Sequence, residues 1–236
     1  MGIFSEAMEK SGKIVGSESA RDPFFSVASI QQHLLGGFLD AVSSLKERPV
    51  LIGVTSSQAG EGVSTVSRML AYALCYSNDK PTFLIDANFI DPSLHIKENF
   101  SQTPGLTEML LNGKTKEPQD IVFSREGLPL RFVASGRTPE SPALMYNHQD
   151  MDSFLEKVRS LASYAIFDLP PVHASPEMIL LARKLDGVIF VVRAHHTQVK
   201  SVALAVDKIR KSGVTLLGGI LNGKKYFIPK WLYERL

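Results

Sequence analysis

The chain has 236 residues, of which 44% are hydrophobic and 21% charged, so it can build the core of a compact domain. A formal net charge of +2 argues against nucleic-acid binding, which usually gathers positive charge on one face. Its single cysteine, Cys75, excludes an internal disulfide and a CxxC zinc motif. No apolar run approaches the roughly 20 residues of a membrane-spanning helix, and the N-terminus lacks a signal-peptide core. We therefore expect a cytoplasmic protein.

The first residues differ in composition from the rest of the chain. Residues 1–22 are polar and rich in Gly, Ser and mixed charge, which predicts a flexible N-terminal arm. Residues 23–236 are predicted to form a single α/β domain that includes a C-terminal tail, 223–236. A helix is expected over about 23–45, where apolar residues recur at three- and four-residue spacing. We favour a tail that packs back on the domain over one that docks on a membrane or partner.

From residue 50 onward, short apolar runs alternate with helical patterns. Because the runs are apolar on both faces, they predict a mostly parallel sheet covered by helices on two sides, a doubly wound three-layer sandwich. We expect strands over 50–55, 82–85, 130–134, 164–167, 187–192 and 215–221, and helices over 64–76, 105–111, 151–161, 177–184 and 199–211.

Polar residues collect where the predicted strands end. In parallel sheets of this kind, ligands bind at the carboxyl ends of the strands. Those ends carry Ser56–Gly62, Asp86, Ser135 with Gly136, Asp168 and Asn222. A binding site at this edge is therefore expected before any motif is considered.

The turn between the first strand and its helix, SSQAGEGVST, has the composition of a phosphate-binding loop. Gly60 and Gly62 let the backbone approach an anion, and Ser64 stands where such loops place a Mg²⁺ ligand. The GxxxxGK[ST] pattern asks for lysine at the position of Val63, and Ser57 replaces its first glycine. Losing that lysine removes a charge-assisted hydrogen bond worth about 1.5–3 kcal/mol. A tight turn that needs glycines for packing alone is the alternative, and a GxGxxG dinucleotide site fits poorly.

The loop and four later segments together resemble the bacterial tyrosine autokinases of exopolysaccharide synthesis, relatives of the MinD/ParA ATPases. SSQAGEGVST is similar to their SxxPGEGKST loop. FLIDANFIDPSLH (83–95) is similar to the Walker A′ segment LLIDADLRxPxxH, and YAIFDLPPV (164–172) to the Walker B segment. LDGVIFVVRAHHTQ (185–198) and GGILNGKKYFIPKWLYERL (218–236) resemble the family's late strand and its asparagine with the following tail. The resemblance spans about residues 50–236 and implies a P-loop NTPase fold.

The resemblance implies a role for each matching residue. Asp86 would be the Walker A′ acid and Asp168 the Walker B acid, which are the catalytic candidates if the protein is active. With Ser64, they would form a tentative Mg²⁺ site. The implied cofactor is ATP or ADP with Mg²⁺. The alternative is that the protein binds no nucleotide. The nucleotide-binding candidates are Gly60, Glu61, Gly62, Val63, Ser64 and Thr65 around the phosphates and Asn222 at the adenine.

Several departures from the family pattern point the same way. Val63 replaces the lysine, Asn88 the second acid of the Walker A′ segment, and Ile90 an arginine. Leu169 replaces the threonine of the Walker B segment. The family's oligomerisation helix is not recognisable in 27–38, and its C-terminal tyrosine cluster is missing. These losses predict weak or absent kinase and ATPase activity.

We therefore expect a regulatory or scaffolding protein of exopolysaccharide synthesis or export. By family analogy its partner is a membrane polysaccharide co-polymerase, which would hold it at the inner membrane as a peripheral protein. A homo-oligomer stays open, and the specific polysaccharide is not indicated.

Two alternatives remain. The protein is an active tyrosine kinase or ATPase if another cation replaces the lysine, and Lys80, Lys97, Arg137 and Arg193 are the candidates. A MinD/ParA-type positioning protein is less favoured, because Gln58 occupies the slot of the signature lysine that such proteins use.

Overall fold

The computed structural model covers the chain and describes residues 49–78, 80–111, 121–124 and 127–223. The predicted arm 1–22, the helix expected over 23–45 and the tail residues 224–236 lie outside the described residues.

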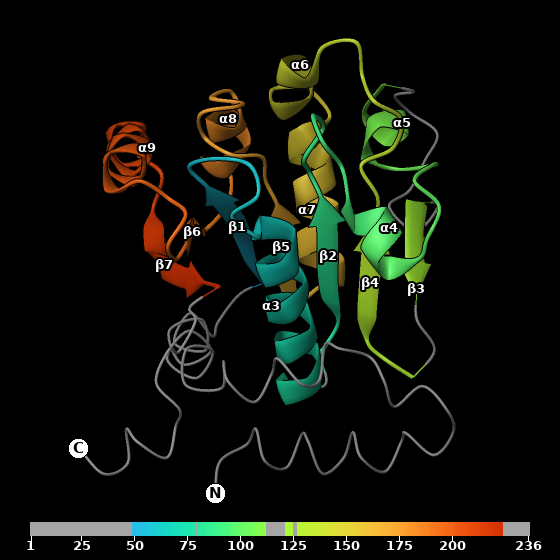
Figure 1. Cartoon of the computed structure of the whole chain (residues 1–236). Helices are drawn as coiled ribbons and strands as arrows, with labels where there is room; N and C mark the ends of the chain where they lie inside the picture. Colours follow the sequence, from blue (N-terminus) through green and yellow to red (C-terminus); the bar gives the residue numbers. More distant parts are fainter. Residues whose placement is uncertain (1–48, 79, 112–120, 125–126, 224–236) are drawn as a thin grey trace, which may run out of the picture.

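Seven strands form one sheet in the order β3-β4-β2-β5-β1-β6-β7 (Figure 1). All neighbouring strands pair in parallel, except that β3 runs antiparallel to β4 at one edge. The prediction of a mostly parallel sheet is therefore confirmed. The strands are β1 (Val50–Ser56), β2 (Thr82–Asp86), β3 (Val122–Ser124), β4 (Leu130–Val133), β5 (Tyr164–Asp168), β6 (Gly187–Arg193) and β7 (Leu216–Asn222).

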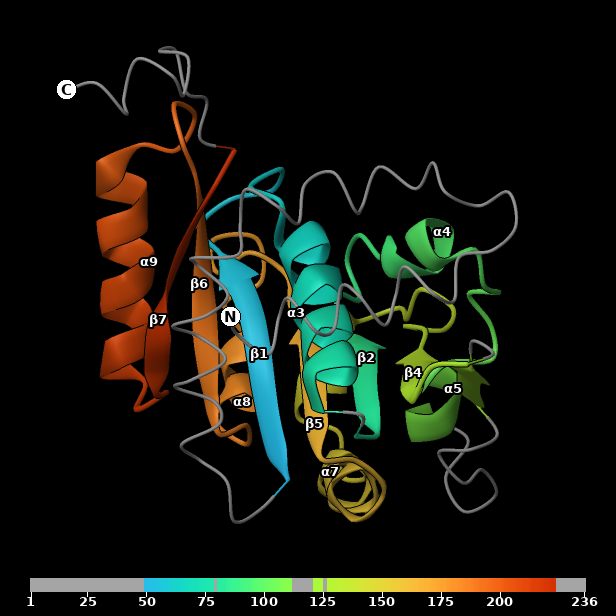
Figure 2. The same ribbon diagram turned by 90° about the horizontal axis from the view of Figure 1, so that it is seen from below.

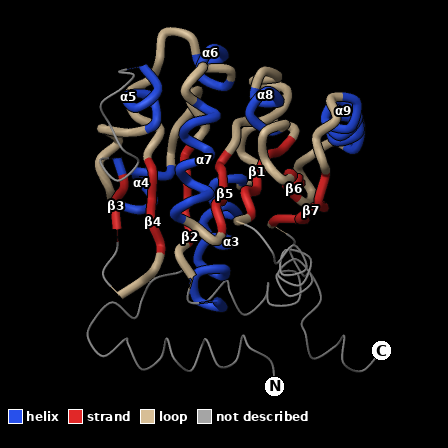
Figure 3. Tube along the Cα trace, turned by 180° about the vertical axis from the view of Figure 1, so that it is seen from behind, coloured by secondary structure: helices blue, strands red, loops and turns tan. Residues whose placement is uncertain are grey.

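Helices cover both faces of this sheet. Helices α3 and α4 lie on one face, and α5 to α9 lie on the other, as Figure 2 shows from below and Figure 3 from behind. The three-layer, doubly wound architecture is thus confirmed. The helices are α3 (Val63–Asn78), α4 (Leu94–Glu98), α5 (Leu106–Leu111), α6 (Pro142–Tyr146), α7 (Met151–Leu161), α8 (Met178–Ala182) and α9 (Val199–Lys211).

The interior strand β1 shows why the sheet is buried on both sides. Val50, Ile52 and Val54 pack into the cluster formed with α3, whereas Leu51 packs into the cluster on the opposite face. Alternate side chains of a strand point to opposite faces, so a strand that is apolar throughout needs cover on both. All seven residues of β1 are buried.

Three short elements were not expected from the sequence: α4, β3 and α6. Each has three to five residues, which is too short for a helical or alternating pattern to stand out. Helix α8 is also shorter than the predicted range 177–184. Of the three, α4 matters most, because it lies beside the loop that follows β1.

None of the described helices has both the length and the apolar character needed to cross a bilayer.

Candidate functional site

Two carboxylates meet at the carboxyl edge of the sheet. Strands β2 and β5 are neighbours, and their final residues, Asp86 and Asp168, are register partners. Asp86 is fully buried and Asp168 is 1% exposed. Oδ1 of Asp86 accepts from the N–H of Asn88 at 3.2 Å, and its Oδ2 accepts from the N–H of Leu94 at 3.1 Å. Oδ1 of Asp168 accepts from Ser67 Oγ at 3.0 Å.

Burial gives the two carboxyls different ionisation behaviour. Desolvation, followed by the neighbouring Asp168, raises the pKa of Asp86 to about 8, against the opposing backbone hydrogen bonds. Desolvation also raises the pKa of Asp168, to about 6, where hydrogen bonds from Ser64 and Ser67 and the charge of Lys97 work against it. Near neutral pH, burial therefore favours a protonated state of this coupled pair of carboxyls over the state in which both are ionised.

One oxygen of Asp168 has no protein partner among the described residues. Among the described residues, Oδ2 of Asp168 is buried without a hydrogen bond. A buried anionic oxygen of this kind is strongly favoured to bind a cation or a water. No cluster of three or more His, Cys, Asp or Glu that could hold a metal occurs in the described part of the chain. The oxygens of Ser64 and Asp168 nevertheless fit a hard cation such as Mg²⁺, which binds few protein ligands when phosphate oxygens complete its shell.

The glycine loop is held from inside by Glu61. Its carboxylate accepts from the N–H of Ser57 at 2.8 Å, from Ser57 Oγ at 2.9 Å and from the N–H of Gln58 at 3.3 Å. Thr197, on the loop after β6, donates to it from Oγ1 at 2.5 Å. The sequence suggested that Glu61 lines the phosphates, but the structure turns this side chain into the loop, at 1% exposure. The Glu61 carboxylate thus stabilises the loop through hydrogen bonds and does not line the cavity.

The two glycines of the loop have left-handed backbone conformations. Gly60 has a φ of +81°, with no atom within 4 Å of the place where a Cβ would lie. Gly62 has a φ of +93°, and a Cβ there would lie 2.0 Å from Nδ2 of Asn222. That Nδ2 donates to the carbonyl of Glu61 at 2.9 Å, and Nη1 of Arg193 donates to the carbonyl of Gly60 at 3.0 Å. The ends of β6 and β7 thus support the loop.

A cavity of about 310 Å³ opens in front of this loop. Of the predicted nucleotide ligands, Gly60, Gly62, Val63, Ser64 and Thr65 line it. The others, Glu61 and Asn222, and the two carboxyls Asp86 and Asp168, are not among its lining residues. The remaining lining residues are Ser56, Gln58, Ala59, Asn88, Ile90, Asp91, Ser93, Lys97, Leu169, Pro171 and Ala174. The adenine role of Asn222 stays a prediction, and its amide nitrogen already contacts the loop.

Two serines beside the predicted magnesium ligand were missed from the sequence. Ser67 donates to Val63 O as well as to Asp168, both at 3.0 Å, and Ser93 lies with its Oγ 3.2 Å from Ser64 Oγ. Ser67 could have been found, because it follows Ser64 by three residues and therefore shares its helix face. No local signal indicates Ser93, whose contact with Ser64 spans 29 residues.

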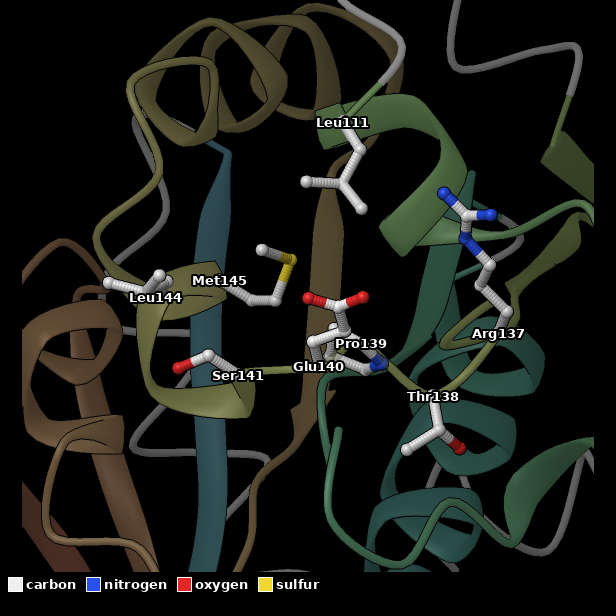
Figure 4. Close-up of a pocket in the computed structure, with 8 residues that line it drawn as sticks. All are labelled: Leu111, Arg137, Thr138, Pro139, Glu140, Ser141, Leu144 and Met145. Atoms are coloured by element: carbon white, nitrogen blue, oxygen red, sulfur yellow. The ribbon is translucent and has the colours of Figure 1, made fainter.

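A second cavity, of about 480 Å³, lies beyond the end of β4. Figure 4 shows its lining side chains, which come from the end of α5, the loop after β4 and α6. Arg137 lies here, and its backbone N–H donates to Glu108 Oε1 at 3.0 Å. This arginine therefore belongs to a different cavity from the glycine loop.

These features, a mostly parallel sheet with a glycine-shaped anion cradle between β1 and α3, define a P-loop-type protein. No family model matches the chain. It is 31% identical over 172 residues to the tyrosine-protein kinase YwqD of Bacillus subtilis, covering 73% of this chain and 71% of that protein. It is 30% identical over 179 residues to the tyrosine-protein kinase CpsD of Streptococcus agalactiae, covering 75% of each. The chain belongs to the bacterial tyrosine-protein kinase family.

Solved structures agree with this assignment. The chimerical protein CapA2B2 superposes with a TM-score of 0.74 at 25% identity, over 80% of this chain and 83% of that one. The septum site-determining protein MinD of Pyrococcus horikoshii, complexed with Mg-ADP, superposes with a TM-score of 0.59 at 15% identity, over 79% of this chain and 76% of that one. The MinD likeness shows the shared fold, as the sequence predicted.

Proposed function

We propose that this chain binds ATP or ADP with Mg²⁺ at the β1–α3 loop and transfers phosphate weakly, as a regulatory member of its family in exopolysaccharide or capsule synthesis. The observation that carries the proposal is the loop itself. Gly60 and Gly62 keep the left-handed backbone conformations of an anion-binding loop, while Val63 occupies the position of the phosphate-binding lysine.

Several features support nucleotide binding. The cavity is lined by Gly60, Gly62 and the first residues of α3, where backbone N–H groups and the helix dipole favour an anion. Ser64 and the unpartnered oxygen of Asp168 are the candidates for the Mg²⁺ site. Bound Mg²⁺ would neutralise phosphate charge. Ser67 and Ser93 would orient these two ligands, through their contacts with Asp168 and Ser64.

The same site gives reasons for weak transfer. Val63 cannot donate a hydrogen bond to a phosphate in the transition state. Burial raises the pKa of Asp86 and so disfavours its ionised form, the form that would accept the proton of an attacking hydroxyl. Asn88, in the place of a second acid, closes a turn by accepting from the N–H groups of Ile90 and Asp91 at 3.3 and 3.2 Å.

A regulatory role also needs a partner. Family analogy suggests a membrane polysaccharide co-polymerase, and the relatives include a kinase domain of VpsO and several proteins named CpsD. Binding such a partner would place this chain at the inner face of the membrane. Nothing in its charge suggests a nucleic acid as an alternative partner.

An active kinase or ATPase is the second candidate function. One observation favours it: Lys97, a cation from outside the loop, lines the same cavity as Val63. A substitute cation would restore part of the lost phosphate interaction.

Nucleotide titration of the full chain, with and without Mg²⁺, tests the first part of the proposal. We expect ATP and ADP to bind, more tightly with Mg²⁺. Calorimetry that detects no binding of either nucleotide would contradict the proposed site.

Transfer of radiolabel from ATP separates the regulatory protein from the active kinase. We expect little or no incorporation, even when the cytoplasmic segment of the partner is added. Robust incorporation that Asp86→Ala abolishes would overturn the proposal of weak transfer and establish the active enzyme.

A further inference from the structure

We propose that Lys97 supplies to the nucleotide phosphates the positive charge that Val63 does not. The inference rests on the proposed function, because it concerns the same nucleotide. It assigns the role of the missing loop lysine to a side chain of α4, 34 positions further along the chain.

The four residues that the sequence offers as substitutes for the loop lysine all lie among the described residues, and the structure places them at different sites. Lys97 lines the cavity in front of the glycine loop. Lys80 lies directly before β2, at the end of the sheet opposite to Asp86. Arg137 lines the other cavity (Figure 4), and Arg193 donates to the carbonyl of Gly60. Of these four, only Lys97 lies where it can face both Val63 and Ser64.

A chain of polar contacts joins Lys97 to the predicted magnesium ligand. Nζ of Lys97 donates to Ser93 Oγ at 2.8 Å, and that oxygen lies 3.2 Å from Ser64 Oγ. The ammonium group is therefore two polar contacts away from Ser64. Because the usual loop lysine directly precedes this serine, both cations would approach the same phosphates, from different sides of the cavity.

Helix α4 holds Lys97 at this place through its neighbours. Glu98 is 3% exposed, accepts from the hydroxyl of Tyr72 at 2.7 Å and forms an ion pair with Arg68, both on α3. At the other end of α4, the N–H of buried Leu94 donates to Asp86. Both ends of the short helix are thus attached, one to α3 and the other to β2.

The Lys97 side chain itself stays adjustable. It is exposed, and its ammonium group donates a hydrogen bond to the hydroxyl of Ser93. The Lys97 ammonium group can exchange its hydrogen bond to Ser93 for one to a phosphate at little energetic expense, because the phosphate oxygen forms a stronger, charge-assisted hydrogen bond.

The test measures ATP affinity for the full-length protein and the variants Lys97→Ala and Lys80→Ala, by calorimetry with Mg²⁺. We expect Lys97→Ala to bind ATP about five- to tenfold more weakly, an effect limited by solvent exposure. Lys80→Ala removes an equal charge at the opposite end of the sheet and should leave the affinity unchanged.

A double-mutant cycle gives a second readout. Val63→Lys should tighten ATP binding more in the Lys97→Ala background than in the parent, because the two lysines then serve the same phosphates. Equal affinities of Lys97→Ala and Lys80→Ala, with ATP still bound by the parent, would overturn the role of Lys97 and leave the proposed function standing. A parent protein that binds no ATP would overturn both.

Discussion

Gly62→Ala should destabilise the protein by about 2–3 kcal/mol and abolish nucleotide binding. A φ of +93° disfavours any residue with a Cβ, by about 1–2 kcal/mol. The new Cβ would also lie 2.0 Å from Nδ2 of Asn222, so this side chain must move and lose its hydrogen bond to Glu61 O, worth about 1 kcal/mol. Urea unfolding measures the first effect, and ATP titration measures the second.

Gly60→Ala is the matched control. Its φ of +81° is similarly strained, but no atom lies within 4 Å of the new Cβ. We expect a loss of about 1–2 kcal/mol from the backbone alone. Adding Asn222→Ala to Gly62→Ala should recover part of the stability, because it removes the colliding amide. Equal losses from Gly60→Ala and Gly62→Ala would show that Asn222 does not constrain the loop.

Asp86→Asn should stabilise the nucleotide-free protein at alkaline pH. The pKa of Asp86 is raised from 3.8 to about 8, mainly by burial, so the folded state keeps a proton that the unfolded chain releases. The stabilisation linked to this proton is fully present below pH 3.8 and is lost as the pH rises through 8. Asn is neutral at every pH, so the variant should avoid that loss, at the expense of one of the two backbone hydrogen bonds that Asp86 accepts.

The expected signature is a difference that grows with pH. In thermal unfolding without Mg²⁺, the melting temperature of Asp86→Asn should rise relative to that of the parent from pH 5 to pH 9 and lie above it at pH 9. Asp207→Asn removes a half-exposed carboxylate that pairs with Lys211 on the surface, and it should change stability only slightly. A parent whose stability does not fall between pH 5 and pH 9 relative to Asp86→Asn would show that Asp86 ionises normally.

The two predictions have opposite signs, since replacing Gly62 should destabilise the folded state, whereas replacing Asp86 should stabilise it at alkaline pH. Asp86 thus makes the folded state less stable than an uncharged residue would, and it belongs to the proposed ligand site. Binding proteins often keep such residues at the expense of stability, because a cradle or a metal site needs a specific backbone or charge.

The sequence by itself determined the layers and the edge of the sheet where the site lies. Strands that are apolar on both faces need helices on both sides, and Asp86 and Asp168 directly follow such strands. The glycine loop was equally readable, because left-handed backbone conformations select glycine at single positions. These features depend on a few consecutive residues, so they are visible without the fold.

The tertiary structure alone decided which distant groups meet. It placed β2 beside β5, so that the two carboxyls became neighbours, and it buried both, which raises their pKa values. It turned Glu61 inward to Thr197, 136 residues away, and brought Asn222 to the loop across 161 residues. It also placed Lys97, but not the other three candidate cations, among the lining residues of the cavity at the glycine loop, on a five-residue helix that no periodicity reveals. Contacts of this length follow from strand order and packing, which local patterns of side chains do not specify.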